Sequence, residues 1–257
     1  NTYYIRNYKS NLYLDVAAPS YKELIQHSFM GGNNQRFVYQ NNTLKSVHTG
    51  SYVTTGANYA ADFPRAVVGS SLKISLSVNT DGTYCILKQD GNTWRALDVY
   101  NSTSVVGWAE YTASSSQKWV LEDGNQAEIA RGTYYIINAN SGKYLQLNET
   151  TGGLVQNTLN SGNNQKWEII KTSSGNYQIK TKSTKYTGYI NIGTDNYGVV
   201  NSSSMNIDIY ENDNGTYKLH MPNLSYCLVV QNASTSNLAK TIWYPYNNTY
   251  NLSLIHI

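Results

Sequence analysis

The sequence predicts an all-β protein made of two similar halves, and three observations support this fold class. Strand-favouring residues are abundant, with 24 Tyr among 257 residues, and no sustained helical periodicity is present. A motif of Gln, a basic residue and a large aromatic residue occurs at 35–37, 117–119 and 165–167. The segment Tyr3-Tyr4-Ile5 returns 131 residues later as Tyr134-Tyr135-Ile136. Repetition at a fixed spacing indicates repeated structural units.

The motif spacing defines a short period nested within the long one. Gln35 and Gln117 lie 82 residues apart, which is twice 41, and Gln165 lies 130 residues after Gln35. Each half therefore has room for three repeats of about 40 residues. Strand-like copies that have lost the motif are expected at three further places, which are 71–76, 205–209 and 248–252.

The repeats predict two domains, residues 1–126 and 127–257, joined near 123–129. Each half has the size of an ordinary domain, and the 40% hydrophobic composition suffices for two compact cores. Short strands separated by Asn-, Gly- and Ser-rich turns are expected throughout.

Some local expectations complete the outline of the fold. A single helical turn is expected at 21–26, and the charges of Glu122 and Asp123 are expected to be solvated near the link between the domains. Cys85 and Cys227 lie in strand-like runs of different halves, so two buried free thiols are expected.

Composition and motifs also bound the function. The net charge of +3 is scattered, with no basic run longer than two residues, so nucleic acid is not an expected partner. No apolar stretch approaches the ~18 residues that a membrane helix needs. The four histidines show no metal-ligand spacing, and no nucleophile elbow or phosphate-binding loop is present. We therefore expect no enzyme activity, no metal and no cofactor.

The repeated Gln-x-aromatic motif, with three repeats in each half, resembles the ricin-type β-trefoil lectins. The resemblance covers the whole chain and implies two tandem β-trefoil domains. It implies that Phe37, Trp119 and Trp167 fill the cores and that the motif Gln residues tie turns together. It also implies non-catalytic carbohydrate binding by pockets within individual repeats.

Such pockets combine an Asp early in the repeat, an aromatic platform in the middle and an Asn or other polar residue just before the Gln. A carboxylate accepts strong hydrogen bonds from sugar hydroxyls, and an aromatic ring covers the apolar face of a sugar. In the first repeat, Ser28 aligns with the platform, and Phe29 replaces it if the loop shifts by one residue. The carbohydrate-binding residues expected in the first half are Asp15, Gln26, Phe29, Asn34, Gln35, Asp98, Trp108 as a platform, Ser116 and Gln117.

The second half departs further from the family pattern. Gln146 stands where the first repeat has Asp15, and Val229 occupies the Asp position of the last repeat. This half is therefore expected to serve mainly in packing or as a partner surface. Its candidate carbohydrate-binding residues are Gln146, Asn164, Gln165, Gln231 and Tyr244, with Tyr244 aligned to Trp108.

The expected function is glycan binding, with galactose-containing glycans favoured, by a secreted bacterial protein. Such a chain would act peripherally at a glycosylated cell surface, as a haemagglutinin or as the receptor-binding part of a larger toxin or enzyme. The start at Asn1 is expected for a mature protein or a fragment. The alternative is a trefoil scaffold that binds a protein partner, as a toxin-complex component or inhibitor, without binding sugar.

Overall fold

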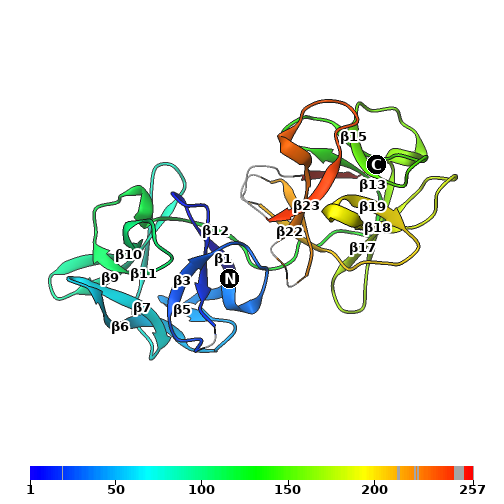
Figure 1. Ribbon diagram of the computed structural model, residues 1–257. Helices are drawn as coiled ribbons and strands as arrows, with labels where there is room; N and C mark the ends of the chain where they lie inside the picture. Colours follow the sequence, from blue (N-terminus) through cyan, green and yellow to red (C-terminus); the bar gives the residue numbers. More distant parts are fainter. Residues whose placement is uncertain (19, 213–214, 223, 225, 246–251, 257) are drawn as a thin grey trace. The chain divides into compact units, whose positions relative to one another are not determined.

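The computed structural model of the protein describes most of the chain, namely residues 1–18, 20–212, 215–222, 224, 226–245 and 252–256 (Figure 1). The chain divides into two compact units, Asn1–Asn125 and Gln126–Ile257. Each unit is a β-trefoil, built from strands and single-turn 3-10 helices. None of the described helices has the length and apolar character needed to cross a bilayer.

The first unit has four strands in each of three repeats. Its strands are β1 (Thr2–Asn7), β2 (Tyr13–Val16), β3 (Leu24–His27), β4 (Arg36–Gln40), β5 (Thr43–Ser46), β6 (Tyr52–Ala60), β7 (Phe63–Gly69), β8 (Ser75–Val78), β9 (Tyr84–Asp90), β10 (Thr93–Val99), β11 (Val106–Glu110) and β12 (Lys118–Asp123). Its 3-10 helices are η1 (Asn33–Gln35), η2 (Tyr100–Ser102) and η3 (Ser115–Gln117). Strand β1 pairs with β2, β4 and β12, while β2–β3, β6–β7 and β10–β11 form three hairpins.

The second unit repeats this plan. Its strands are β13 (Gly132–Asn138), β14 (Tyr144–Leu147), β15 (Leu154–Asn157), β16 (Trp167–Lys171), β17 (Tyr177–Thr181), β18 (Tyr189–Ile192), β19 (Gly198–Asn201), β20 (Asp208–Glu211), β21 (Tyr217–His220), β22 (Tyr226–Val230), β23 (Thr241–Pro245) and β24 (Leu252–His256). Its 3-10 helices are η4 (Asn163–Gln165), η5 (Thr194–Asn196) and η6 (Gln231–Ala233). Strand β13 pairs with β16 and β24, as β1 does with β4 and β12.

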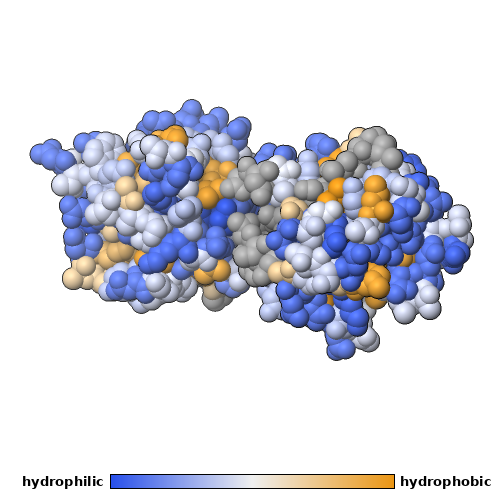
Figure 2. Space-filling model, turned by 90° about the horizontal axis from the view of Figure 1, so that it is seen from above, coloured by the Kyte–Doolittle hydropathy of each residue, from blue (hydrophilic) through white to orange (hydrophobic). Residues whose placement is uncertain are grey.

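Each unit encloses its own core, and the predicted core aromatic residues lie there. Phe37, Trp119 and Trp167 have no exposed surface, which confirms their predicted place. Each indole N–H is also satisfied, because Trp119 donates to the Leu97 carbonyl at 2.9 Å and Trp167 to the Leu145 carbonyl at 3.1 Å. Figure 2 shows polar residues over most of the visible face, with apolar residues in small patches.

The three motif Gln side chains make the same pair of backbone contacts. Each Gln ends a 3-10 helix, is buried, and bonds a backbone N–H five residues earlier and a carbonyl seven residues earlier. The N–H groups of Met30, Thr112 and Asn160 donate to Oε1 of Gln35, Gln117 and Gln165 at 2.7, 2.9 and 2.8 Å. Nε2 of the same residues donates to the carbonyls of Ser28, Glu110 and Thr158 at 2.8, 2.7 and 2.8 Å. Because unpaired buried backbone groups are costly, these bonds fix the loop before each motif.

Two local expectations are wrong. Residues 21–26 form no helical turn, because Leu24 begins β3, whose backbone pairs with β2. Glu122 is not solvated, since it lies on β12 with 1% of its surface exposed. Its carboxylate accepts hydrogen bonds from Arg6 Nε at 2.8 Å and from the Tyr13 hydroxyl at 3.0 Å. The pairing of β12 with β1 brings these partners to it, which the sequence near a domain link does not reveal.

The remaining expectations concern the cysteines and the copies without the motif. Cys85 and Cys227 are buried free thiols, as expected. Of the region 71–76, only its end is in a strand, since β8 begins at Ser75, and within 205–209 a strand begins at Asp208. In the third region, residues 248–251 lie outside the described residues, and Leu252 begins β24.

Replacing Trp119 with Ala should lower the free energy of unfolding of the first unit by about 3–5 kcal/mol, because it empties the core and removes the Leu97 contact. Urea denaturation followed by circular dichroism measures this. Trp94, 44% exposed on β10, provides the matched control, and Trp94→Ala should change stability by about 0.5 kcal/mol or less. Equal losses in the two variants would contradict the core role of Trp119.

Candidate functional site

In the third repeat, the carboxylate of Asp98 lines a hollow of about 280 Å³. Asp98 lies on β10 and is only partly buried. Its Oδ2 accepts a hydrogen bond from Gln117 Nε2 at 3.0 Å, and its Oδ1 accepts one from the Val99 N–H at 2.7 Å. A carboxylate offers about four acceptor positions, so two internal bonds orient Asp98 while leaving capacity for a ligand.

An aromatic wall stands beside this carboxylate. Tyr100, at the start of η2, and Phe63, at the start of β7, both line the hollow, with ring centroids 4.9 Å apart. Gly107 lies directly opposite Asp98 in the β10–β11 hairpin, and a Cβ there would collide with the Phe63 ring. The missing side chain of Gly107 therefore lets an aromatic residue of the preceding repeat approach the Asp98 strand.

A second hollow, of about 210 Å³, adjoins the first. Lys9, Val99, Ser102 and Ser116 line both hollows. The second extends to polar residues of the first repeat, which are Asn7, Ser10 and Gln26. Together the two hollows form a polar depression that joins the third repeat to the first.

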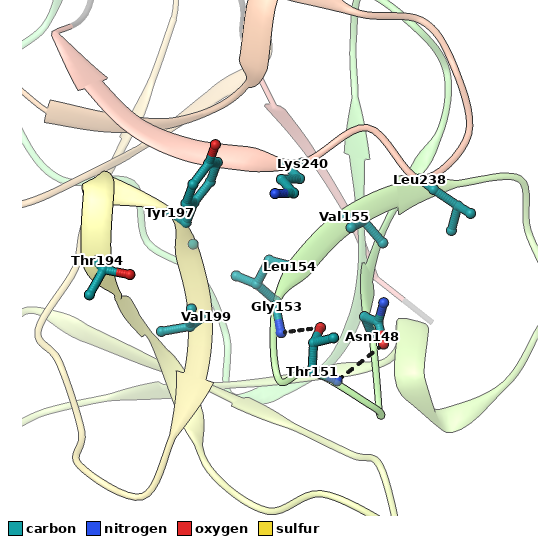
Figure 3. A pocket seen from close by; sticks show the side chains of 11 residues that line it. Asn148, Thr151, Gly153, Leu154, Val155, Thr194, Tyr197, Val199, Leu238 and Lys240 are labelled. Carbon is teal, nitrogen blue, oxygen red and sulfur yellow. Dashed lines mark hydrogen bonds between the residues drawn. The ribbon is translucent and has the colours of Figure 1, made fainter.

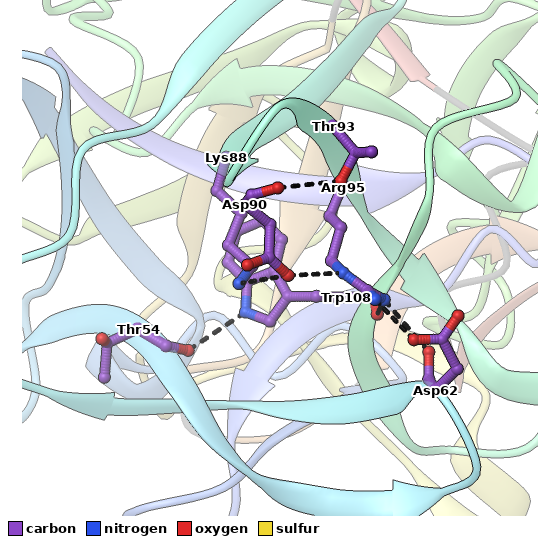
Figure 4. A network of polar contacts seen from close by, with 7 residues as sticks. All are labelled: Thr54, Asp62, Lys88, Asp90, Thr93, Arg95 and Trp108. Carbon is purple, nitrogen blue, oxygen red and sulfur yellow. Dashed lines mark hydrogen bonds and ion pairs between the residues drawn. The ribbon is translucent and has the colours of Figure 1, made fainter.

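The prediction that Trp108 is the aromatic platform is wrong. Its ring has no exposed surface, and its Nε1 donates to the Thr54 carbonyl at 3.2 Å (Figure 4). The Lys88 ammonium lies 5.7 Å from the ring centroid, and burial lowers the pKa of Lys88. Side chains alternate along a strand, so Trp108 points to the core while its neighbour Ala109 lines the hollow. The partly exposed Tyr100 takes the predicted role, and the buried Phe63 packs against its ring. The glycine within strand β11, which makes room for Phe63, was the sequence signal for this arrangement.

In the first repeat, Asp15 and Asn34 form a closed pair. Asp15 is 4% exposed, and both of its oxygens lie 2.9 Å from Asn34 Nδ2. Burial raises the pKa of Asp15, although hydrogen bonds from Asn34 and Gln35 act in the opposite direction. In the third repeat Ser116 replaces Asn34, and its hydroxyl pairs with that of Ser114 at 3.1 Å. The shorter side chain leaves Asp98 more accessible than Asp15.

The other first-half candidates have mainly structural roles. Phe29 is not a sugar contact, because its ring is fully buried with centroids 4.9 Å from those of Tyr4 and Tyr13. Gln35 and Gln117 are buried behind the carboxylates, so they position the site rather than line it. Gln26 lines the second hollow, but its amide already bonds Ser10 Oγ and the Thr103 carbonyl.

In the first repeat of the second unit, Gln146 stands at the Asp position, and its side chain is held by hydrogen bonds within the protein. Gln146 Oε1 accepts hydrogen bonds from Gln165 Nε2 at 3.0 Å and Asn160 Nδ2 at 3.2 Å. Gln165 itself is buried and holds its loop, so it does not line a site. Asn164 is partly exposed and makes no side-chain hydrogen bond to other described residues.

In the last repeat, the alignment of Tyr244 with Trp108 is wrong by one residue. Trp243 is the counterpart of Trp108, because it is fully buried and its Nε1 donates to the Asn191 carbonyl at 3.1 Å. Tyr244 is 52% exposed and lies opposite Cys227, whereas Val229 pairs with Ile242. Tyr244 and the partly exposed Gln231 remain candidates without a carboxylate at the Asp position. Within the described part of the chain, no group of three metal-ligating side chains occurs.

Comparisons with known proteins agree with the trefoil fold. Residues 115–199, which include two of the three motifs, match the family model described as ricin-type beta-trefoil lectin domain-like. The chain is similar to the ricin-type β-trefoil lectins. No curated protein sequence matches the chain.

A solved structure shares the fold of this chain. A mosquitocidal holotoxin matches with a TM-score of 0.74 and 18% identity over all of this chain, which spans 34% of that structure. The Rhizoctonia solani agglutinin has 20% identity and a TM-score of 0.46, over 52% of this chain and all of its own. The Macrolepiota procera ricin B-like lectin, in complex with lactose, has 22% identity and a TM-score of 0.41, over 47% of this chain and 94% of its own.

The raised pKa of Asp15 predicts a specific pH dependence of stability. The folded state keeps this proton at pH values where the unfolded chain has lost it. Asp15 therefore contributes stability at low pH that is lost as the pH rises through the folded pKa. Relative to Asp15→Asn, the native chain should lose stability as the pH rises above about 4, the ordinary pKa of Asp, measured by denaturation at each pH. A native chain that gains stability relative to the variant over this range would contradict the assignment.

Proposed function

We propose that the chain binds glycans without catalysing a reaction, and that the Asp98 hollow is its main site. The observation that carries this proposal is the oriented carboxylate of Asp98 beside an aromatic wall, which is the partly exposed ring of Tyr100 backed by the buried Phe63. The carboxylate accepts hydrogen bonds from adjacent sugar hydroxyls, and the aromatic wall covers the apolar face of the ring. We place a second, more closed site at the Asp15–Asn34 pair, which has the carboxylate but not the aromatic wall.

The size and lining of the depression support more than one bound sugar residue. The first hollow is close to the low end of ligand pockets, roughly 300 Å³, and the second continues it toward Ser10 and Gln26. Among the described residues, Asp98 is the one carboxylate that lines the first hollow. Glycoside hydrolysis needs two carboxyl groups about 5–9.5 Å apart on either side of the bond, so this lining favours binding over hydrolysis.

The family resemblance supports the finer parts of the proposal. We infer a preference for galactose-containing glycans and a secreted bacterial protein that acts as a haemagglutinin or as the targeting part of a larger toxin or enzyme. Single open sites bind weakly, and two sites on one chain gain avidity on a glycan-covered surface.

A second candidate function concerns the second unit alone. Its Asp positions hold Gln146 and Val229, while Leu238 and Tyr244 are 61% and 52% exposed. Exposed aromatic and aliphatic side chains without a carboxylate suit contact with a protein better than contact with a sugar. The second unit would then bind a toxin or enzyme partner while the first binds glycans.

The Asp98→Asn variant should bind the glycans of the native chain about tenfold or more weakly, because it loses charge-assisted hydrogen bonds. A glycan array with the full chain identifies the ligand, and titration calorimetry gives the affinities. Asp195→Asn changes an exposed carboxylate of the second unit and should leave binding unchanged. Unchanged binding by Asp98→Asn would reject the site, and absence of binding to any glycan would reject the lectin function.

The Tyr100→Ala variant should weaken glycan binding by about two- to tenfold, because aromatic contacts of this kind contribute about 0.5–1.5 kcal/mol. Tyr244→Ala removes an exposed ring from a repeat without a carboxylate and should leave the affinity of the native chain unchanged. The reverse order of effects, measured by the same titration, would move the main site to the second unit.

A further inference from the structure

A hollow of about 350 Å³ lies in the second unit where three hairpins meet (Figure 3). Its lining comes from all three repeats, through the segments 148–155, 194–199 and 238–240. Backbone bridges join these segments, from Gly153 to Val199 and from Val155 to Lys240. The hollow therefore lies near the approximate threefold axis of the trefoil, whereas the Asp98 site belongs to one side of the other unit.

The lining combines an apolar surface with one unpaired cation. Val199 and Leu238 provide the accessible aliphatic surface, and the Lys240 ammonium lies 4.5 Å from the centroid of the Tyr197 ring. Among the described residues, no carboxylate lies within ion-pair distance of Lys240. Within the same part of the chain, the hydroxyls of Tyr197 and Thr194 make no hydrogen bond. The site thus offers a positive charge and free hydroxyl groups to a ligand.

The first unit provides an internal comparison for this place in the fold. Its bridges from Glu23 to Val67 and from Ile25 to Val105 correspond to those that join the hairpins of the second unit. Glu23 there forms an ion pair with Arg65 at 3.3 Å, and Val105 is buried. In the first unit, the cation near the threefold axis is therefore Arg65, and the Glu23 carboxylate pairs with it.

In the second unit, the corresponding carboxylate is absent. Gly153 stands at the position of Glu23, Tyr197 at that of Arg65 and Lys240 at that of Val105. The cation of the second unit, Lys240, is on a different hairpin from Arg65 in the first. Because Gly153 has no acidic side chain, space is left beside Lys240. A ligand that brings its own carboxylate would restore the charge balance that Glu23 provides in the first unit.

The rim of the hollow includes an exposed residue with an unfavourable backbone conformation. Leu238 has φ of 61° and is 61% exposed. A non-Gly residue in the left-handed region is uncommon, and such strain is concentrated at binding sites. With this backbone conformation, the apolar side chain of Leu238 lies exposed at the edge of the hollow.

We propose that this axial hollow binds an acidic monosaccharide unit, a hexuronic or sialic acid residue. Its carboxylate pairs with the Lys240 ammonium, and its apolar face packs on Val199 and Leu238. Its hydroxyls bond to Thr194 and to Asn148 Nδ2, which is free because only Asn148 Oδ1 holds the backbone N–H groups of Thr150 and Thr151. The site is independent of the Asp98 hollow, so either can fail without the other.

Titration of the ¹⁵N-labelled full chain with methyl glucuronide and with the methyl glycoside of N-acetylneuraminic acid tests the proposal. Backbone signals of Gly153, Val199 and Lys240 should shift at millimolar concentrations of at least one acidic sugar. Methyl glucoside, the neutral match of methyl glucuronide, should leave these signals in place. Unshifted signals with both acidic sugars, or equal shifts with the neutral sugar, would overturn the proposal. Octanoate is a carboxylate without sugar hydroxyls. Shifts with octanoate but with neither acidic sugar would overturn the sugar assignment.

Two variants locate the interaction. Gly153→Glu introduces the acidic residue of the first unit, and its Cβ would meet Thr151 Oγ1 at 3.3 Å, which a small movement accommodates. This variant should abolish binding of the acidic sugar, and Lys240→Gln should weaken it about tenfold or more. The spectra themselves report whether each variant is folded. Native affinity in both folded variants would overturn the proposal.

Discussion

The buried amide of the motif Gln is the contact on which the rest of this structure depends. Each loop before a motif turns inward and leaves one backbone N–H and one carbonyl away from water. A single primary amide satisfies both, since it carries a donor and an acceptor on one planar group. Once Gln117 holds its loop, Trp119 two residues later points into the core. The same Nε2 also bonds Asp98, so the frame and the candidate site share one side chain.

Small differences between the residues near each motif Gln decide whether the site is open or closed. The amide of Asn34 closes over Asp15, whereas Ser116 is too short to do the same to Asp98. In the second unit, the neutral Gln146 takes the carboxylate position and is bonded by the frame itself. The fold tolerates all of these residues because the backbone contacts of the Gln do not change. Binding can therefore be lost in one repeat without loss of the fold.

The spacing of Gln35, Gln117 and Gln165 was sufficient to predict the repeats, whereas the core position of the aromatic residues was implied by the resemblance to the trefoil lectins. The aromatic platform was not predictable in the same way. Gly107, Trp108 and Ala109 form an apolar run, so the sequence does not tell which of them faces the core, and a shift by one residue reverses every side chain. Tyr100 and Phe63 come together only through tertiary structure, as do Gly153 and Lys240. Glu122 was misjudged for the same reason, since its partner Arg6 lies at the other end of the unit's sequence.

The motif Gln orients a carboxylate, and we propose that this carboxylate binds the sugar. The most direct measurement is a crystal structure of the full chain with a bound galactoside. We expect sugar in the Asp98 hollow, with ring hydroxyls about 2.5–3.0 Å from the Asp98 carboxylate and the apolar face of the sugar against Tyr100. A galactoside bound elsewhere, with the Asp98 hollow free of sugar, would contradict it.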